Sequence, residues 1–173
     1  RIGWLDALSA MGAAVTIDSW SMRCGEPVAD IALAHRPLAA VRIDGPLVPR
    51  AIDELPLLAV VATQAHGTTV IADAAELRHK ESDRIAAIAA GLDRLGADVT
   101  VRPDGLAITG PTPLRGAPLD GAGDHRIVMA LAVAALAATG TTVIGDGERV
   151  DDSFPGFVEA LRALGGGVAV GGR

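Results

Sequence analysis

Aromatic residues are scarce in this sequence, and their scarcity restricts how a core can be built. The 173 residues include two Trp, two Phe and no Tyr, although half of all residues are hydrophobic. The core must therefore come from Ala, Leu, Val and Ile, which favours helices packed closely on a sheet. A chain of this length suits one domain and is short for two.

Cysteine is nearly absent as well, with Cys24 as the single example. One cysteine excludes an internal disulfide and any metal site built from several thiolates. Such low cysteine usage is typical of a reducing compartment, so we expect a cytoplasmic protein.

A long apolar run and an excess of basic residues are also missing. No stretch of about 18 uncharged apolar residues occurs, and the first residues lack the pattern of a signal peptide. The net charge is −6, whereas nucleic-acid binding needs clustered Lys and Arg that release counterions. We therefore expect neither a membrane nor a nucleic-acid partner, and a local cluster must bind any anionic ligand.

A repeated segment is the main feature that is present. GTTVIAD at Gly67–Asp73 returns as GTTVIGD at Gly140–Asp146. An Ala- and Leu-rich stretch precedes each copy, and it begins at Asp53 in the first and at Asp124 in the second. Each stretch predicts a helix that is capped by its Asp and leads through Gly into a short strand.

A second shared signature follows each copy of the repeated segment. It reads GLDRLGADVTV around Gly96 and ALRALGGGVAV around Gly165. A helix that ends at Gly and is followed by alternating Val predicts an exit into a strand. The same ending occurs a third time, as ALSAMGAAVTI around Gly12, with only a few residues before it.

These signatures divide a single domain, residues 1–173, into three repeats. We assign residues 1–52 to a partial first repeat that is truncated at its start, 53–116 to the second and 117–173 to the third. Between positions 18 and 50, four Pro residues separate short apolar runs, which predicts strands and turns. The alternation of helices and strands predicts an α/β layer structure.

Charged residues gather where the predicted helices begin, and there free backbone N–H groups and the helix macrodipole favour an anion. The strongest cluster is ELRHKESDR, which ends at Arg84. Lys80 and Arg84 could bind a phosphate or carboxylate, and Glu81 could transfer a proton. The alternative is a solvated helix start held by ion pairs such as Glu81 with Arg84.

A second cluster, GDHR, opens the apolar stretch 127–138 with Asp124, His125 and Arg126. A guanidinium beside a buried helix needs a partner, either a bound anion or a carboxylate. In the simpler alternative Asp124 caps the helix, Arg126 pairs with an acid, and Asp53 is an ordinary cap of the earlier helix. If these helix starts meet in one cleft, they form a pocket for a phosphorylated substrate with carboxylates inside it.

Four motifs occur in order: IDELPLLAVVA, ELRHKESDRI, GDHRIVMALAVAAL and SFPGF. In these motifs and their spacing, from about Gly3 to the end, the sequence resembles the C-terminal half of the 5-enolpyruvylshikimate-3-phosphate synthases. The resemblance implies an inside-out α/β barrel domain of repeated βαβαββ units. It also implies transfer of the enolpyruvyl group of phosphoenolpyruvate to the 5-hydroxyl of shikimate 3-phosphate, with release of phosphate. No metal or organic cofactor is implied.

The resemblance further implies catalytic roles for three residues. Asp53 would contact the shikimate hydroxyl as a candidate base, and Glu81 would exchange a proton at the methylene carbon. Which carboxylate is the acid and which is the base stays open. Lys80 would lie between the two substrates and could also carry a proton.

Substrate binding is implied in the same way for two arginines. Arg84 and Arg126 would hold phosphoenolpyruvate, because a guanidinium binds carboxylate and phosphate with two hydrogen bonds. Asp124 and His125 belong to the same motif and would act behind Arg126, by fixing its position.

Two positions depart from the pattern of some family members. Asp152 stands where they carry a Lys that binds phosphoenolpyruvate, and Glu76 stands where they have an Asn near the shikimate phosphate. The detailed ligand contacts and the response to glyphosate therefore stay open. Because the family's other phosphate-binding residues lie in its N-terminal domain, we expect that domain as the partner and an inactive chain without it.

Other readings of the sequence remain. A UDP-N-acetylglucosamine carboxyvinyltransferase shares the fold and the donor, but KESDR and the lack of a matching cysteine loop count against it. A non-catalytic binding module of the same fold is a further alternative. An RNA 3′-phosphate cyclase would need a basic surface, which the acidic net charge disfavours.

Overall fold

A four-stranded sheet organises the computed structural model, which describes residues 2–171. The strand order is β3–β4–β6–β5. Strand β3 runs parallel to β4, whereas β6 is antiparallel to both of its neighbours. The bounds of these strands are β3 Arg42–Ile43, β4 Gly67–Ile71, β5 Asp98–Arg102 and β6 Gly105–Gly110.

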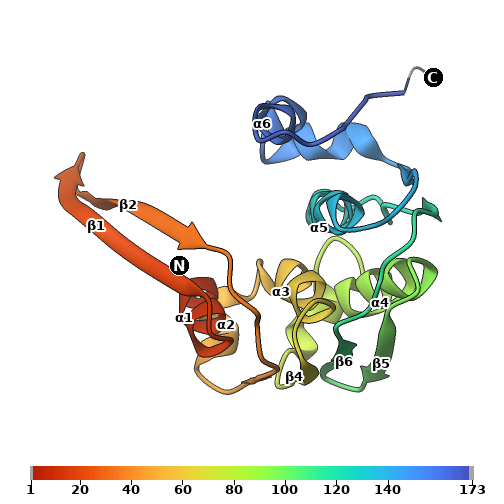
Figure 1. Cartoon of the computed structure of the whole chain (residues 1–173), viewed down its shortest axis with the longest axis horizontal. Coiled ribbons are helices and arrows are strands. Elements are labelled where there is room, and N and C mark those ends of the chain that lie inside the picture. Colours follow the sequence, from red (N-terminus) through yellow and green to blue (C-terminus); the bar gives the residue numbers. More distant parts are fainter. Residues whose placement is uncertain (1, 172–173) are drawn as a thin grey trace.

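The helices lie on one side of this sheet, with α3 and α4 nearest to it, α5 above them and α6 beyond (Figure 1). Because α3 lies between the sheet and other helices, most of its positions are buried, as its nearly all-apolar sequence requires. The bounds are α3 Leu55–Ala62, α4 Arg84–Arg94, α5 His125–Leu136 and α6 Phe157–Ala163.

The main core confirms the composition argument. Its fully buried members are Ala, Leu, Ile and Val side chains from the sheet and the helices above it. Trp4 packs at the margin of this core, and Phe157 belongs to a smaller cluster between α5 and α6. The mixed α/β fold class predicted from the sequence is confirmed.

Helices α4 and α5 approach each other closely at Gly91. A Cβ atom at this position would lie 2.5 Å from Cδ2 of Leu131, which is closer than real contacts allow. Glycine therefore lets the two helices come together. The close approach brings Arg84 at the start of α4 beside Asp124 at the start of α5.

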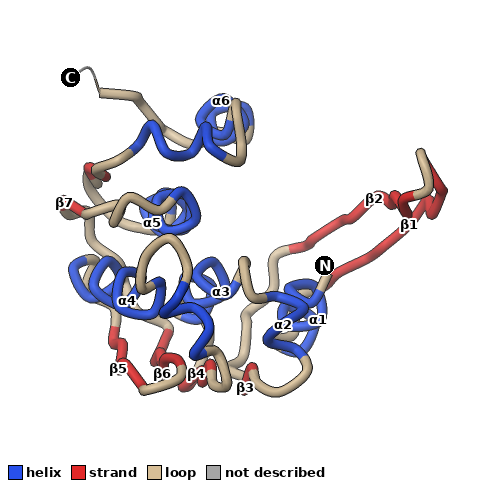
Figure 2. Tube along the Cα trace, turned by 180° about the vertical axis from the view of Figure 1, so that it is seen from behind, coloured by secondary structure: helices blue, strands red, loops and turns tan. Residues whose placement is uncertain are grey.

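A long hairpin projects from the body of the molecule (Figures 1 and 2). Its antiparallel pairing starts at Ala14 with Ala34 and becomes irregular between Asp18 and Ser21. Most of its side chains are exposed. The hairpin and the helices next to it are α1 Gly3–Ala10, β1 Ala14–Arg23, β2 Glu26–Ala34 and α2 Leu47–Ala51.

Helix α2 differs from the prediction of strands and turns between positions 18 and 50. Strands β2 and β3 do form there, but residues 47–51 are helical. Pro46 stands at the N-cap position and Pro49 in the first turn, where the missing N–H has no helical acceptor to lose. Proline therefore starts a helix here instead of preventing one.

The second and third repeats place the same kinds of element in the same order: helix, strand, 3-10 helix, helix. This order runs through α3, β4, η1 and α4, and again through α5, β8, η2 and α6. The remaining bounds are β7 Pro118–Leu119, β8 Val143–Ile144, η1 Ala75–His79 and η2 Gly147–Asp152.

The third repeat carries less strand than its sequence predicts. The segment GTTVI is a full strand at 67–71, but only Val143 and Ile144 are paired in the later copy. The strand predicted after Gly165 is wrong, because residues 166–171 have no regular structure. A short strand is stable only beside a partner, and within residues 2–171 none pairs with this segment.

Candidate active site

Three helix starts meet above the sheet, and capping side chains fix two of them. Asp83 precedes α4 and accepts a hydrogen bond from the backbone N–H of Ala86 at 3.0 Å. Asp124 precedes α5 and accepts from the backbone N–H of Arg126 at 2.9 Å. Both capping geometries follow the rule for Asp before a helix.

The cap predicted at Asp53 is wrong. Glu54 stands at the N-cap position of α3, and its side chain makes no capping hydrogen bond. The carboxylate of Asp53 faces the arginines of the other two helix starts instead. Two charged partners bind a carboxylate more strongly than one backbone N–H does.

Arg84 is the centre of the charged cluster, although only 1% of its surface is exposed. Its Nε donates to Oδ2 of Asp124 at 2.8 Å, and its Nη2 donates to Oε2 of Glu81 at 2.5 Å. Its Nη1 donates to Oδ1 of Asp53 at 3.3 Å. A buried guanidinium requires such partners, since an unpaired charge away from water is very unfavourable.

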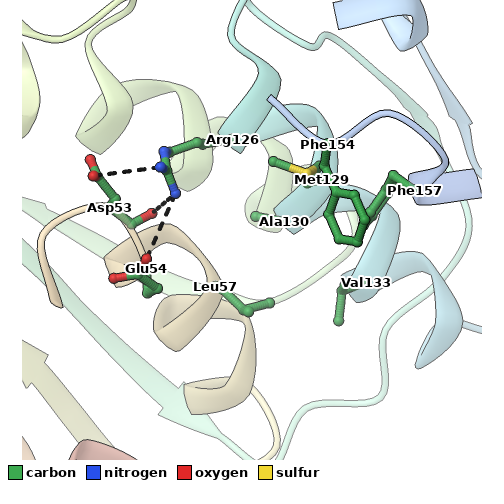
Figure 3. Close-up of a pocket in the computed structure, with 9 residues that line it drawn as sticks. All are labelled: Asp53, Glu54, Leu57, Arg126, Met129, Ala130, Val133, Phe154 and Phe157. Atoms are coloured by element: carbon green, nitrogen blue, oxygen red, sulfur yellow. Dashed lines mark hydrogen bonds and ion pairs between the residues drawn. The ribbon is translucent and has the colours of Figure 1, made fainter. Parts of the chain in front are cut away.

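Asp53 connects this buried group to a second arginine. Oδ2 of Asp53 lies 3.5 Å from Nη2 of Arg126, whose Nη1 donates to the backbone carbonyl oxygen of Asp53 at 3.4 Å. The same Nη1 is 3.8 Å from Oε1 of Glu54 (Figure 3). The structure therefore brings Asp53, Glu81, Arg84 and Arg126 into one network, as the sequence led us to expect.

Asp124 is fully buried and stays charged because of its partners. Burial by itself raises the pKa of its carboxyl group. Hydrogen bonds from the Arg84 guanidinium, the Arg126 backbone N–H and the Ser82 hydroxyl act in the opposite direction, as does the charge of Arg84. Together they hold the pKa of Asp124 below its ordinary value, so the Arg84–Asp124 ion pair persists at neutral pH.

A cavity of about 200 Å³ opens beside Arg126. One end is polar and the other is apolar, where the rings of Phe154 and Phe157 pack edge to face with centroids 5.6 Å apart (Figure 3). A small acid with a charged end fits such a lining. The lining residues are Asp53, Glu54, Leu57, Arg126, Met129, Ala130, Val133, Phe154 and Phe157.

Two predicted residues take other positions. Lys80 precedes Glu81 in the chain, but its Nζ pairs with Oε1 of Glu76 at 2.6 Å. His125 is the first residue of α5 and is half-buried. Asp152, the position of the family's variable Lys, is exposed and 3.6 Å from Arg149.

The sequence also suggested a solvated helix start as an alternative for the ELRHKESDR segment. The ion pair between Glu81 and Arg84 that this alternative names is present. The burial of Arg84, however, does not suit a solvated face, because Arg is almost never buried unless it is paired. The end of the segment at which α4 begins is therefore a packed charged cluster.

Glu54 and Ser82 are site residues that the sequence reasoning missed. Both stand inside motifs that were singled out, Glu54 next to Asp53 and Ser82 next to Glu81. The apolar wall of the cavity was also missed. Its residues come from α3, α5, α6 and the loop before α6, so no local pattern marks them as neighbours.

Neither a metal site nor a membrane span is found within residues 2–171. No group of three or more His, Cys, Asp or Glu side chains there is placed to hold a metal ion. No helix in the same range has the length and apolar character needed to cross a membrane.

Proteins of known sequence or structure resemble this chain over most of its length. It is 52% identical to a 3-phosphoshikimate 1-carboxyvinyltransferase of Desulforudis audaxviator over 164 residues, which are 95% of the chain. A protein of the same name from Gloeobacter violaceus is 53% identical over 161 residues. The chain spans about 38% of the length of these curated relatives.

Solved structures agree with this result. An EPSP synthase from Acinetobacter baumannii matches with a TM-score of 0.91 and 39% identity, over 94% of this chain and 38% of that one. The enolpyruvyl transferase NikO from Streptomyces tendae matches with a TM-score of 0.72 and 27% identity, over 94% of this chain and 35% of that one.

A family description completes the comparison. The sequence model of the family EPSP synthase (3-phosphoshikimate 1-carboxyvinyltransferase) matches residues 2–161. That range contains the three helix starts, the charged network and the cavity lining described above. The chain therefore belongs to the EPSP synthase family.

Proposed function

We propose that this chain forms the C-terminal part of an enzyme that transfers the enolpyruvyl group of phosphoenolpyruvate to the 5-hydroxyl of shikimate 3-phosphate. A C–O bond forms between that hydroxyl and the central carbon of phosphoenolpyruvate, and the methylene carbon takes up a proton. Phosphate then leaves the tetrahedral intermediate as the new methyl group loses a proton, which restores the methylene group. The whole enzyme acts in the cytoplasm, without nucleic acid or a membrane as partner.

One observation carries this proposal: carboxylates and arginines from three helix starts form a single network beside a cavity. The network contains the groups that the reaction needs, namely cations for an anionic donor and carboxylates for proton transfer. An assembly held only for stability would not require an open cavity at its edge.

Arg126 is the arginine that a ligand meets first. Its side chain is 30% exposed, it lines the cavity, and its ion pairs with Asp53 and Glu54 are long, at 3.5 and 3.8 Å. Phosphoenolpyruvate can replace these loose contacts with shorter, charge-assisted hydrogen bonds. We assign the binding of the donor's anionic groups to Arg126.

Arg84 lies inside the network and does not line the cavity. Because it is enclosed by Asp53, Glu81 and Asp124, it can contact phosphoenolpyruvate only when one of these carboxylates moves away. Glu81 is the one that can move most easily, since half of its side chain is exposed. Its release from Arg84 would free a guanidinium for the donor and a carboxylate for proton exchange at the methylene carbon.

Asp53 and Lys80 complete the proposed set. Asp53 is held between Arg84 and Arg126, in a position to accept the proton of the attacking hydroxyl. Lys80 must leave Glu76 to reach a substrate, and its long side chain allows that movement. His125 and Asp124 support Arg126 by fixing the first turn of α5.

The chain by itself is proposed to be inactive, with the N-terminal domain of the same enzyme as its partner. This follows from its coverage of about 38% of its relatives. The remaining binding groups would come from the rest of the enzyme. The chain alone retains the network but lacks these further groups.

Phosphate release measures this proposal directly. The chain is co-expressed with the N-terminal part of the Desulforudis audaxviator relative, and phosphoenolpyruvate and shikimate 3-phosphate are added. We expect turnover from the mixture and none from the chain alone. Glu81→Gln should lower kcat by about 10²-fold or more, since a positioned acid or base contributes that much.

A matched control uses Glu159→Gln. Glu159 is an exposed acid on α6, so its amide variant changes the net charge equally without touching the network. We expect unchanged turnover from this variant. Full activity in Glu81→Gln, or a stable complex that never releases phosphate, would refute the proposed reaction.

A further inference from the structure

Arg78 belongs to the ELRHKESDR segment but has no part in the charged network of the site. Its Nη1 donates to Oδ2 of Asp83 at 2.7 Å. Its Nε donates to the backbone carbonyl oxygen of Pro103 at 2.9 Å, and its Nη2 donates to that of Arg102 at 2.8 Å. One guanidinium thus binds three separate acceptors, which its planar arrangement of donors makes possible.

Two of these acceptors belong to the turn between β5 and β6, and this turn also holds the chain before η1. Oδ2 of Asp104 accepts from the backbone N–H of Asp73 at 2.8 Å. The carbonyl oxygen of Asp104 accepts from the backbone N–H of Ala74 at 2.8 Å. The turn therefore fixes the connection into η1 at its start and, through Arg78, near its end.

The third acceptor, Asp83, links Arg78 to the start of α4. Its Oδ1 accepts from the backbone N–H of Ala86 and caps the helix, while its Oδ2 binds Arg78. Desolvation raises the pKa of this carboxyl group, but the hydrogen bonds from Ala86 and Arg78 together hold the pKa below its ordinary value. We call Arg78 with its three acceptors the Arg78 clamp.

The clamp closes the base of a short loop, residues 80–82, which we call the KES loop. This loop forms no helix or strand. Within residues 2–171 the backbone N–H groups of Lys80, Glu81 and Ser82 donate no hydrogen bond, and the Ser82 hydroxyl donates to Asp124 at 3.0 Å. The position of the loop backbone therefore depends on contacts at its ends, and the Arg78–Asp83 pair joins the residues on either side of it.

The third repeat builds the same elements without such a clamp. The two copies of GTTVI, and the Asp with positive φ that closes each repeated segment, set the alignment. Asp151 then stands at the position of Arg78, and Gly156 at that of Asp83. Because η2 and α6 form all the same, the repeat needs no guanidinium here. The third repeat also has no Lys–Glu pair between η2 and α6, so the clamp accompanies the KES loop and not the repeat.

We infer that Arg78 is a positioning residue for the proposed reaction, on which this inference rests. In that reaction Lys80 leaves Glu76 and Glu81 leaves Arg84, so these ion pairs cannot fix the loop during turnover. The Arg78 clamp involves neither side chain and keeps the loop backbone in place while both change partners. Arg78 itself touches no substrate and acts through Lys80 and Glu81.

Activity tests this role in the chain co-expressed with the N-terminal part of the Desulforudis audaxviator relative, with phosphate release as the readout. We expect Arg78→Gln to lower kcat by about 10²-fold, since a displacement of about 1 Å can cost that much. The KM for phosphoenolpyruvate should stay within about twofold, since donor binding is assigned to Arg126 on a different helix.

Three further variants separate geometry from charge and from folding. Arg78→Lys keeps the charge but offers one nitrogen for three acceptors, so we expect less than about a tenth of the parent kcat. Asp83→Asn retains a capping side chain but loses the ion pair, and should lower kcat by about tenfold. The control is Arg94→Gln, which removes an exposed arginine of α4 that donates to the carbonyl oxygen of Pro118 at 3.1 Å. Its kcat should equal that of the parent.

A second measurement needs neither substrate nor the N-terminal part. Backbone ¹⁵N relaxation of the full chain gives order parameters for the amides of residues 80–82. We expect values of about 0.85 in the parent chain and below about 0.6 in Arg78→Gln, as for rigid and flexible backbone. The amides of α4 and α5 should keep their order parameters in both, because Asp83 and Asp124 still cap these helices.

Several results would overturn this inference: an unchanged kcat in Arg78→Gln, full activity in Arg78→Lys, or order parameters that do not change. A fall in kcat that comes with loss of the α4 and α5 signals would mean that Arg78→Gln has not folded, and Asp83→Asn then decides by the same two measurements. If the parent mixture releases no phosphate although the order parameters fall, the clamp stands and the proposed reaction fails.

Discussion

At the scale of single residues, the burial of Arg84 determines how the cluster behaves. Asp124 accepts hydrogen bonds from Arg84 with both of its carboxylate oxygens. Removing either side chain therefore leaves the other buried without this charged partner. An unpaired buried charge is far less stable than a buried pair. The two groups therefore stabilise the folded state only together.

Replacing Asp124 by Asn should test this dependence. We expect Asp124→Asn to lower the free energy of unfolding by about 3–5 kcal/mol, because Arg84 keeps its charge and loses its best partner. Asp152→Asn removes a carboxylate from an exposed pair with Arg149 and should change it by no more than about 0.5 kcal/mol. Urea unfolding followed by circular dichroism measures both, and equal effects would contradict the central place of Arg84.

The pKa of Asp124 also predicts how stability changes with pH. This pKa is lower in the folded chain than the ordinary value of 3.8, so the unfolded chain binds the proton more readily. The stabilisation is complete well above pH 3.8 and is lost as the pH falls toward the lowered folded pKa. Unfolding curves between pH 6 and pH 2 should show this loss, and Asp124→Asn should show a smaller decline over the same interval.

At the scale of elements, the meeting of α4 and α5 at Gly91 sets the distance between their first residues. Arg84 and Asp124 lie at the ends of these helices, about two turns from the crossing. A side chain at position 91 would push Leu131 away and separate the helices. The ion pair at the helix ends would then lengthen.

A comparison of two leucine substitutions on α4 measures this effect. Gly91→Leu should lower the free energy of unfolding by about 1–3 kcal/mol, since overpacking forces the helices apart. Ala90→Leu adds a side chain on the exposed face of the same helix and should change it by less than about 0.5 kcal/mol. A Gly91→Leu variant as stable as the parent chain would show that the contact can relax freely.

The whole molecule divides into a packed body and a projecting hairpin. The main core contains residues of the sheet and helices, but none of the residues from position 14 to 34. Segments with few buried apolar contacts open at low free energy. The hairpin therefore adds little to the stability of the isolated chain.

Shortening the hairpin should confirm this division. Residues 19–29 are replaced by Asn-Gly, which joins Asp18 to Asp30, a cross-strand pair in the structure, through a favoured two-residue turn. We expect the free energy of unfolding to change by less than about 1 kcal/mol, as for surface changes away from the core. A much larger loss, measured by thermal unfolding, would mean that the hairpin and the body unfold as one unit.

The sequence predicted much of the fold because local signals agree with the tertiary structure. Asp83 and Asp124 cap helices as their positions suggest, and Gly12 and Gly96 follow the ends of helices. Apolar residues at helical spacing then define the core. The prediction failed at residues 166–171, where strand formation depends on a neighbour that no local pattern reveals.

The sequence by itself determined the family, the order of helices and strands, and the chemical types at the site. Only the tertiary structure decided that Asp53 bridges two arginines, that Arg84 is enclosed, and that Glu54 faces the cavity. Capping and helix formation depend on residues within one turn, so a sequence can show them. Ion pairs across 31 to 73 positions depend on how whole helices pack, and that packing is settled by the complete core.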